Sequence, residues 1–146
     1  MSFAVQMNPE KKQQAYQLIA ELQKERQEVW SLYCHIAELI PFSANRTVRK
    51  KLARFSEILI DYVSLGHFGV CEYMFAGVDS LDPAFSLVEK IDLVLSASTE
   101  AAVLFNDKYE SDAAIILDDL KQDLSALGES LAARSDLEDQ LCELML

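Results

Sequence analysis

The segment from residue 60 to residue 68 reads IDYVSLGHF and places polar groups and a glycine inside an apolar run. If it is helical, Asp61 and Ser64 lie on one face, because residues three apart are neighbours on a helix surface. We expect that face to be exposed. Asp61 then offers a carboxylate to an arginine or lysine of a partner, and Tyr62 and Phe68 supply aromatic anchors. A solvated helix face without a partner fits the same residues, so both interpretations stay open.

His67 offers two further kinds of chemistry. It lies four residues before Cys71, so both side chains would face one side of a continuing helix and could bind a metal. Two ligands do not complete a site, and the sequence lacks the Glu-x-x-His motif of carboxylate-bridged di-iron bundles. A histidine phosphotransfer bundle is the other possibility, although the lysine that follows the phosphorylated histidine in such domains is missing. A metal-binding or phosphotransfer bundle centred on His67 is therefore the alternative function.

Other catalytic patterns are absent from the sequence. It has two histidines and four glycines, and it lacks a serine-hydrolase elbow, a Walker loop and a dinucleotide-binding fingerprint. Its three cysteines, Cys34, Cys71 and Cys142, lie far apart without CxxC spacing. We therefore predict a protein that is not an enzyme and that needs no cofactor or metal.

Apolar residues recur at alternating steps of three and four in four segments, which is typical of helices that bury one face. The segments are bounded by helix signals: Asn8 precedes Pro9, Pro41 follows the first segment, and Asp82 precedes Pro83. The residues expected to face the core are Ile19, Leu22, Arg26, Val29, Tyr33, Ile36 and Ile40; Val48, Leu52, Phe55, Leu59 and Tyr62; Ala84, Leu87, Ile91, Val94, Ser98, Ala101 and Phe105; and Leu117, Leu120, Leu124, Leu127, Leu131, Arg134, Glu138 and Leu141.

These four segments predict one all-α domain that spans residues 1–146 and folds as an antiparallel four-helix bundle. A chain of 146 residues is long enough for one core, and 4 Gly and 3 Pro are too few for the turns of a β-sandwich or barrel. A helix should bend or stop at an interior glycine. We therefore expect the second helix to break near Gly66.

Three charged residues occupy positions where leucine would pack at lower cost: Arg26 in the first helix, and Arg134 with Glu138 in the last. Arg134 and Glu138 are four residues apart and can pair on one helix, and Arg26 reaches them if the two helices are neighbours. The sequence therefore predicts a buried polar cluster. The alternative is that the arginine stems pack while their charged groups reach the solvent.

Charge is distributed unevenly along this acidic chain, whose formal net charge is −11. Residues 1–54 hold nine Lys or Arg and five Asp or Glu, whereas residues 55–146 hold four and nineteen. The acidic part can attract a basic partner or simply keep the protein solvated. We expect no direct binding to nucleic acid, because the net charge repels phosphates and the basic run 46–54 spreads its charges around one helix.

The sequence also predicts the compartment. It has neither an apolar region of signal-peptide type at its start nor a stretch of the roughly 20 apolar residues that span a bilayer. We therefore expect a cytoplasmic protein that does not bind membranes, while its oligomeric state stays open.

Four blocks of this sequence, in this order, make it similar to one known family. They are Glu25-Arg26-Gln27 leading to Pro41-Phe42, Asp61-Tyr62-x-Ser64-x-Gly66-His67-Phe68, Phe105-Asn106-Asp107, and Leu127-Gly128-Glu129-x-Leu131-x-Ala133-Arg134-x-x-Leu137-Glu138-Asp139. Together they cover most of the chain from about Leu18 to Leu144, and they resemble the Rsd/AlgQ regulators, bacterial anti-sigma factors.

The resemblance implies a helical bundle that captures region 4 of the primary sigma factor, its C-terminal promoter-recognition domain, and so lowers housekeeping transcription. Region 4 is a basic helix-turn-helix, which an acidic protein complements. Carried over by position, the resemblance implies that Asp61 makes the charged contact and that Ser64, His67 and Phe68 line the same edge. Gly66 would set the bend that exposes them.

The first helix departs from the family pattern. It reads Ala20-Glu21-Leu22 where the family often has Asp-Arg-Trp. If that departure removes sigma binding, the bundle serves as an adaptor for another basic protein.

Overall fold

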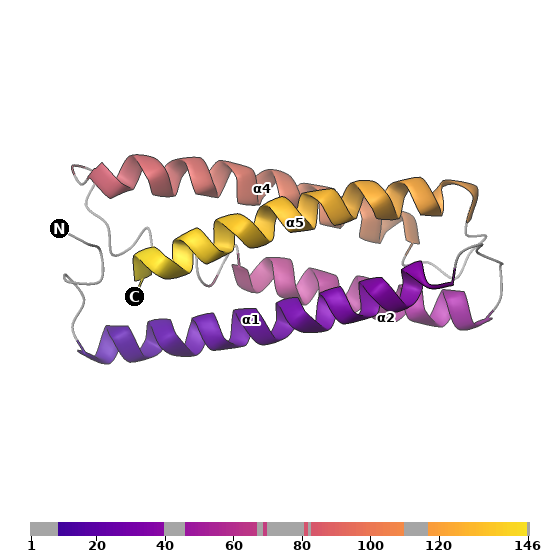
Figure 1. Cartoon of the computed structure of the whole chain (residues 1–146), viewed down its shortest axis with the longest axis horizontal. Coiled ribbons are helices and arrows are strands. Elements are labelled where there is room, and N and C mark those ends of the chain that lie inside the picture. Colours follow the sequence, from indigo (N-terminus) through magenta and orange to yellow (C-terminus); the bar gives the residue numbers. More distant parts are fainter. Residues whose placement is uncertain are drawn as a thin grey trace.

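Four long helices make up the computed structural model, which describes residues 9–39, 46–66, 69, 81, 83–109 and 117–145. They are α1 (Pro9–Ala37), α2 (Arg46–Ser64), α4 (Pro83–Tyr109) and α5 (Leu120–Met145), and a short 3₁₀ turn, η3 (Leu117–Asp119), leads into α5. The chain direction alternates from each helix to the next (Figure 1). The described residues contain no strand, so the protein is all-α.

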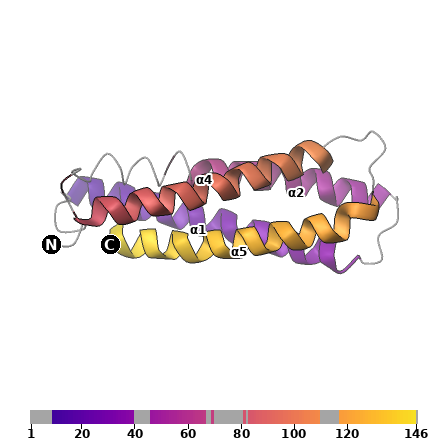
Figure 2. The ribbon, with the colours of Figure 1, turned by 90° about the horizontal axis from the view of Figure 1, so that it is seen from above.

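The helices pack in adjacent pairs around one core. α1 contacts α2 and α5, and α4 contacts the same two helices. A view from above, turned by 90° about the horizontal axis, shows the same four helices side by side (Figure 2). This is the arrangement of a four-helix bundle. Among the described helices, none combines the length and the apolar character that a membrane span requires.

Helix boundaries follow the signals in the sequence. α1 begins at Pro9 and α4 begins at Pro83, as predicted, because proline fits the first turn of a helix. α1 ends at Ala37, earlier than Pro41 alone requires, and Glu38 N–H closes the last turn by donating to the Cys34 carbonyl at 3.0 Å.

The C-terminal end of α2 is described only in part. The α-helix runs to Ser64, and Leu65 and Gly66 continue it in the wider π-helical geometry. Residues 67 and 68 lie outside the described residues. The break expected near Gly66 therefore stays a prediction.

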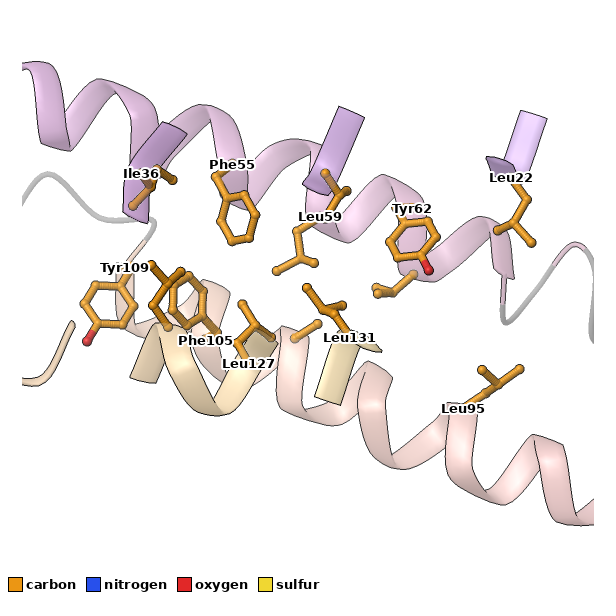
Figure 3. Packing of buried hydrophobic residues seen from close by; sticks show 14 of the residues in the cluster. Leu22, Ile36, Phe55, Leu59, Tyr62, Leu95, Phe105, Tyr109, Leu127 and Leu131 are labelled. Atoms are coloured by element: carbon orange, nitrogen blue, oxygen red, sulfur yellow. The ribbon is translucent and has the colours of Figure 1, made fainter. Parts of the chain in front are cut away.

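The core consists of the inward faces of the four helices (Figure 3). Every core residue expected on α2 is buried, as are those expected from Leu120 to Leu141 on α5. The prediction for α4 was wrong at Val94, which is 43% exposed, and was met only in part at Ala101, which is half-buried, while Leu95 and Ala102 are fully buried. Both choices satisfy steps of three and four, so the helical period alone does not decide which of two adjacent residues faces inward.

A row of aromatic rings fills the end of the core where α1 finishes and α2 begins. Phe55 packs edge-on against Phe105 at 5.8 Å between centroids, and Tyr33 lies 6.3 Å from Phe55. The Tyr33 hydroxyl donates to the Leu124 carbonyl at 2.9 Å. A Cβ atom at Gly128 would lie 2.8 Å from Cζ of Tyr33, so glycine at this position lets the tyrosine cross to α5.

Candidate functional site

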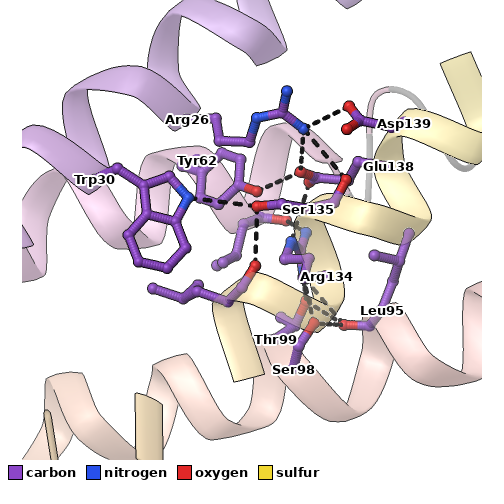
Figure 4. Close-up of polar contacts among 12 residues, drawn as sticks. Arg26, Trp30, Tyr62, Leu95, Ser98, Thr99, Arg134, Ser135, Glu138 and Asp139 are labelled. Atoms are coloured by element: carbon purple, nitrogen blue, oxygen red, sulfur yellow. Dashed lines mark hydrogen bonds and ion pairs between the residues drawn. The ribbon is translucent and has the colours of Figure 1, made fainter. Parts of the chain in front are cut away.

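Arg134 lies at the centre of a polar cluster inside the bundle (Figure 4). Its side chain is fully buried, and its guanidinium donates to three helices. Nη1 donates to Ser98 Oγ at 2.9 Å and Thr99 Oγ1 at 2.8 Å on α4, and Nη2 donates to the Val63 carbonyl on α2 at 3.0 Å. Arg134 therefore fixes α2 and α4 to α5 through the planar fork of its donors.

Glu138 balances the charge of Arg134. Arg134 Nε donates to Glu138 Oε2 at 3.2 Å, and the Tyr62 hydroxyl donates to Oε1. Burial raises the pKa of Glu138, while the charges of Arg134 and Arg26 and the Tyr62 hydrogen bond oppose that rise. A buried carboxylate with several donors is compensated, whereas the same group without them would cost several kcal/mol.

Arg26 closes the cluster on the side of α1. Its Nη1 lies 3.6 Å from Glu138 Oε1 and donates to Asp139 Oδ1 at 2.9 Å. Beside it, Trp30 Nε1 donates to Ser135 Oγ at 3.4 Å. The structure thus brings together the three charged residues that the sequence analysis grouped, and it adds Asp139 at the edge.

Gly66 connects this cluster to the end of α2. The glycine is buried, and a Cβ atom there would lie 2.7 Å from Nη2 of Arg134 and 3.1 Å from Oε2 of Glu138. Glycine therefore lets the last turn of α2 approach the ion pair directly. This close approach is a different role from the bend that the family resemblance implies.

The residues predicted to bind a partner differ in their exposure, and two of them lie outside the described residues. Asp61 is exposed and Ser64 is half-buried. Tyr62 is 1% exposed, with its ring in the core and its hydroxyl on Glu138, so it offers no aromatic anchor to a partner in this structure. Tyr62 ends the apolar face of α2, and burial of that face turns the Tyr62 ring toward the core. His67 and Phe68 lie outside the described residues.

Asp61 belongs to an acidic surface shared by α1 and α2. The pKa of Glu25 is raised by burial and by the charges of Glu21, Asp61 and Glu28, so each of these three carboxylates lies close enough to repel Glu25. Such a surface is favourable for lysine or arginine side chains of a partner.

Two buried oxygen atoms near Asp61 lack a hydrogen-bond partner among the described residues. They are Oε2 of Glu25 and Oγ of Ser56. Ser56 and Asp61 line the same groove between α2 and α4, together with Glu57 and Asn106. Buried polar atoms are usually satisfied, so these two exceptions need an explanation.

A second polar cluster ties α4 to the start of α5, and the sequence analysis missed it. Lys108 Nζ lies 3.2 Å from Asp119 Oδ2 and 2.7 Å from Asp123 Oδ2, and the Tyr109 hydroxyl donates to Asp123 at 2.5 Å. The hydrogen bonds from Lys108 and Tyr109 lower the pKa of Asp123 in spite of its partial burial. The signal in the sequence for this cluster was the acidic start of the last helix together with one lysine, Lys108, at the end of the helix before it.

The metal alternative finds no support in the described part of the chain. No group of three His, Cys, Asp or Glu side chains there is arranged to hold a metal ion. His67 and Cys71, on which that alternative depends, lie outside the described residues.

Known proteins now place this arrangement in a family. A family model described as "Regulator of RNA polymerase sigma(70) subunit, Rsd/AlgQ" matches residues 1–146. A "Regulator of sigma D" of Yersinia pseudotuberculosis is 33% identical over 135 residues, which are 87% of this chain and 78% of that protein. Its counterpart in Yersinia enterocolitica is 32% identical over 87% of this chain and 79% of its own length. No solved structure matches. The chain therefore belongs to the Rsd/AlgQ family of regulators of the RNA polymerase sigma(70) subunit.

Proposed function

We propose that this chain is a cytoplasmic anti-sigma factor that sequesters the primary sigma factor by binding region 4, its C-terminal promoter-recognition domain. Members of the Rsd/AlgQ family are regulators rather than enzymes, and their partner is a sigma factor. Binding to region 4 would block its contact with the promoter and so lower housekeeping transcription. The proposed contact edge is the exposed side of α2 from Asp61 onward, with Ser64, His67 and Phe68.

The main support for this proposal comes from the exposure of Asp61 and from the charged and polar groups near it. The carboxylate is exposed, it lies close enough to Glu25 on α1 for the two charges to repel, and Ser56, whose buried hydroxyl has no partner among the described residues, lines the same groove. The lysine and arginine side chains of a basic helix-turn-helix can donate to the exposed carboxylate of Asp61. Neighbouring acids repel one another until a cation separates them, so binding also relieves that repulsion.

Charge and burial contribute differently to such a complex. The acidic surface speeds the encounter with a basic domain and makes the association rate fall as salt rises. Affinity comes from a few buried contacts, and losing one such contact typically costs about 2 kcal/mol or more. Because Tyr62 lies in the core, we expect Phe68 to be the aromatic residue of the proposed edge that makes such a buried contact.

Titration calorimetry with purified region 4 tests the proposal. We expect the full chain to bind and Asp61→Asn to weaken binding at least tenfold, which is about 1.4 kcal/mol. Asp136→Asn is the matched control, because it removes the same charge from an exposed position on α5. If the full chain does not bind region 4, the function is wrong. Equal effects of the two variants would show that the site is elsewhere.

A further inference from the structure

The outer side of α4 carries a largely exposed apolar stripe. Leu93 and Leu104 are 71% and 62% exposed, and Ala97 and Ala101 lie between them. The spacing of four, four and three residues places all four on one side of the helix, over about 16 Å of its length. α4 packs against α2 and α5 through another side, which carries buried Val88, Ile91 and Leu95, so it has two apolar sides where one suffices for the bundle.

The stripe continues into a groove between α4 and α5. Ala101, Leu104 and Phe105 line it from α4, and Ala126 and Leu127 line it from α5. Two of the large hydrophobic side chains exposed among the described residues, Leu93 and Leu104, belong to the stripe, whereas Val94 and Val103 on α4 point about 100° away from it. Contiguous exposed apolar surface of this kind marks an interaction site more often than scattered single residues do.

The charged residues around the stripe indicate which kind of partner would cover it. Exposed Glu89, Glu100 and Asp107 lie eleven and seven residues apart, so they form a row along one side of the stripe. In the groove, the Lys108 ammonium is bound by Asp119 and Asp123. Lys90 adds one positive charge near the start of the stripe, so carboxylates outnumber cations on this face.

From this pattern we propose that the outer face of α4 binds an amphipathic helix of a second partner protein, one with leucine-type anchors flanked by lysine or arginine. The anchors would fill the stripe at helical spacing, and the flanking cations would meet the acidic row. Antiparallel pairing with a second copy of this chain suits the face poorly, because it would bring the two acidic rows together. This surface is separate from the Asp61 edge on α2, so it adds a partner to the proposed function.

Fluorescence anisotropy with a designed peptide tests this proposal on the full chain. The probe is a labelled helix of about four turns, with leucines on one face and lysines elsewhere. We expect it to bind the unmodified protein, and we expect Leu93→Glu/Leu104→Glu to reduce its affinity at least tenfold. The substitution adds negative charge, so non-specific attraction of the cationic peptide would rise instead. Tyr16→Glu, on the exposed face of α1, is the matched control and should keep the affinity.

Four results would overturn the proposal. The first is equal affinity of the peptide for the double variant and the unmodified protein. The second is equal binding of a peptide with glutamates in place of the lysines. The third is a dimer in sedimentation that the double variant abolishes, because a second copy would then cover the stripe. The fourth is loss of region 4 binding in the double variant, because the stripe would then belong to the sigma interface. Thermal melting should be unchanged, since both leucines are exposed.

Discussion

Gly66 and Arg134 occupy adjoining space: a Cβ atom on residue 66 would lie 2.7 Å from Nη2 of the arginine. That Nη2 also donates to the Val63 carbonyl, three residues before the glycine. The buried guanidinium of α5 therefore determines how the end of α2 sits, and the proposed sigma-binding edge begins at this end. If the proposed edge binds sigma, this glycine connects it to the buried ion pair.

Gly66→Ala should destabilise the protein. The contacting atom ends a long side chain, but that side chain is fully buried and held by hydrogen bonds to three helices, so it has little room to move. We expect a loss of about 1–3 kcal/mol in the free energy of unfolding, the usual cost of overpacking. Urea unfolding measures it. Unchanged stability would mean that α2 can shift away from Arg134 at no cost.

Arg134 and Glu138 should show strong coupling in a double-mutant cycle. Arg134→Met leaves the Glu138 carboxylate buried with fewer donors, and we expect this to cost about 3–5 kcal/mol. Replacing both residues, as Arg134→Met/Glu138→Leu, removes the unpaired charge and should cost less than the sum of the single changes. The free energies of unfolding of the four proteins give the coupling. Additive costs would show that the two side chains do not stabilise each other.

Features that depend on local periodicity were predicted from the sequence. Features that depend on how each helix is rotated about its own axis were missed. The seam of α2 was predicted from apolar residues at steps of three and four, although it did not include Ser56 and Val63, which are also buried. The partners of Arg134 on α4, Ser98 and Thr99, were not predicted, because they meet it only at one rotation of α4 about its axis. Val94 was misplaced for the same reason. At the candidate site, exposure of Asp61 follows from its position on the helix, whereas the contact between Gly66 and Arg134 joins distant parts of the chain.

The hydroxyl of Tyr62 should make the protein less stable in alkali. Burial is the main reason that its pKa is raised above the ordinary value, and the charge of Glu138 adds to the rise. Because the folded state holds this proton more tightly, its stabilising contribution is complete below about pH 10 and is lost as the pH rises further. The unfolding free energy should then fall by up to about 1.4 kcal/mol per pH unit from this residue.

Tyr62→Phe is the control for this effect. It lacks the titrating group, so its unfolding free energy should fall less steeply above pH 10, although the variant is less stable at neutral pH through the loss of the bond to Glu138. Urea unfolding across this pH range compares the two slopes. Parallel slopes would show that the Tyr62 hydroxyl ionises equally in the folded and unfolded states.

Leu127 and Leu104 line the same groove between α4 and α5 but differ in burial, and this makes them a matched pair. Leu127 is 4% exposed, so Leu127→Ala opens a cavity and should cost about 2–5 kcal/mol. Leu104 is 62% exposed, so Leu104→Ala should change stability by no more than about 0.5 kcal/mol. Thermal and urea unfolding separate the two. If both variants unfold like the unmodified protein, Leu127 does not face the core and α5 is rotated from the position described, because a buried leucine cannot be truncated without losing its contacts.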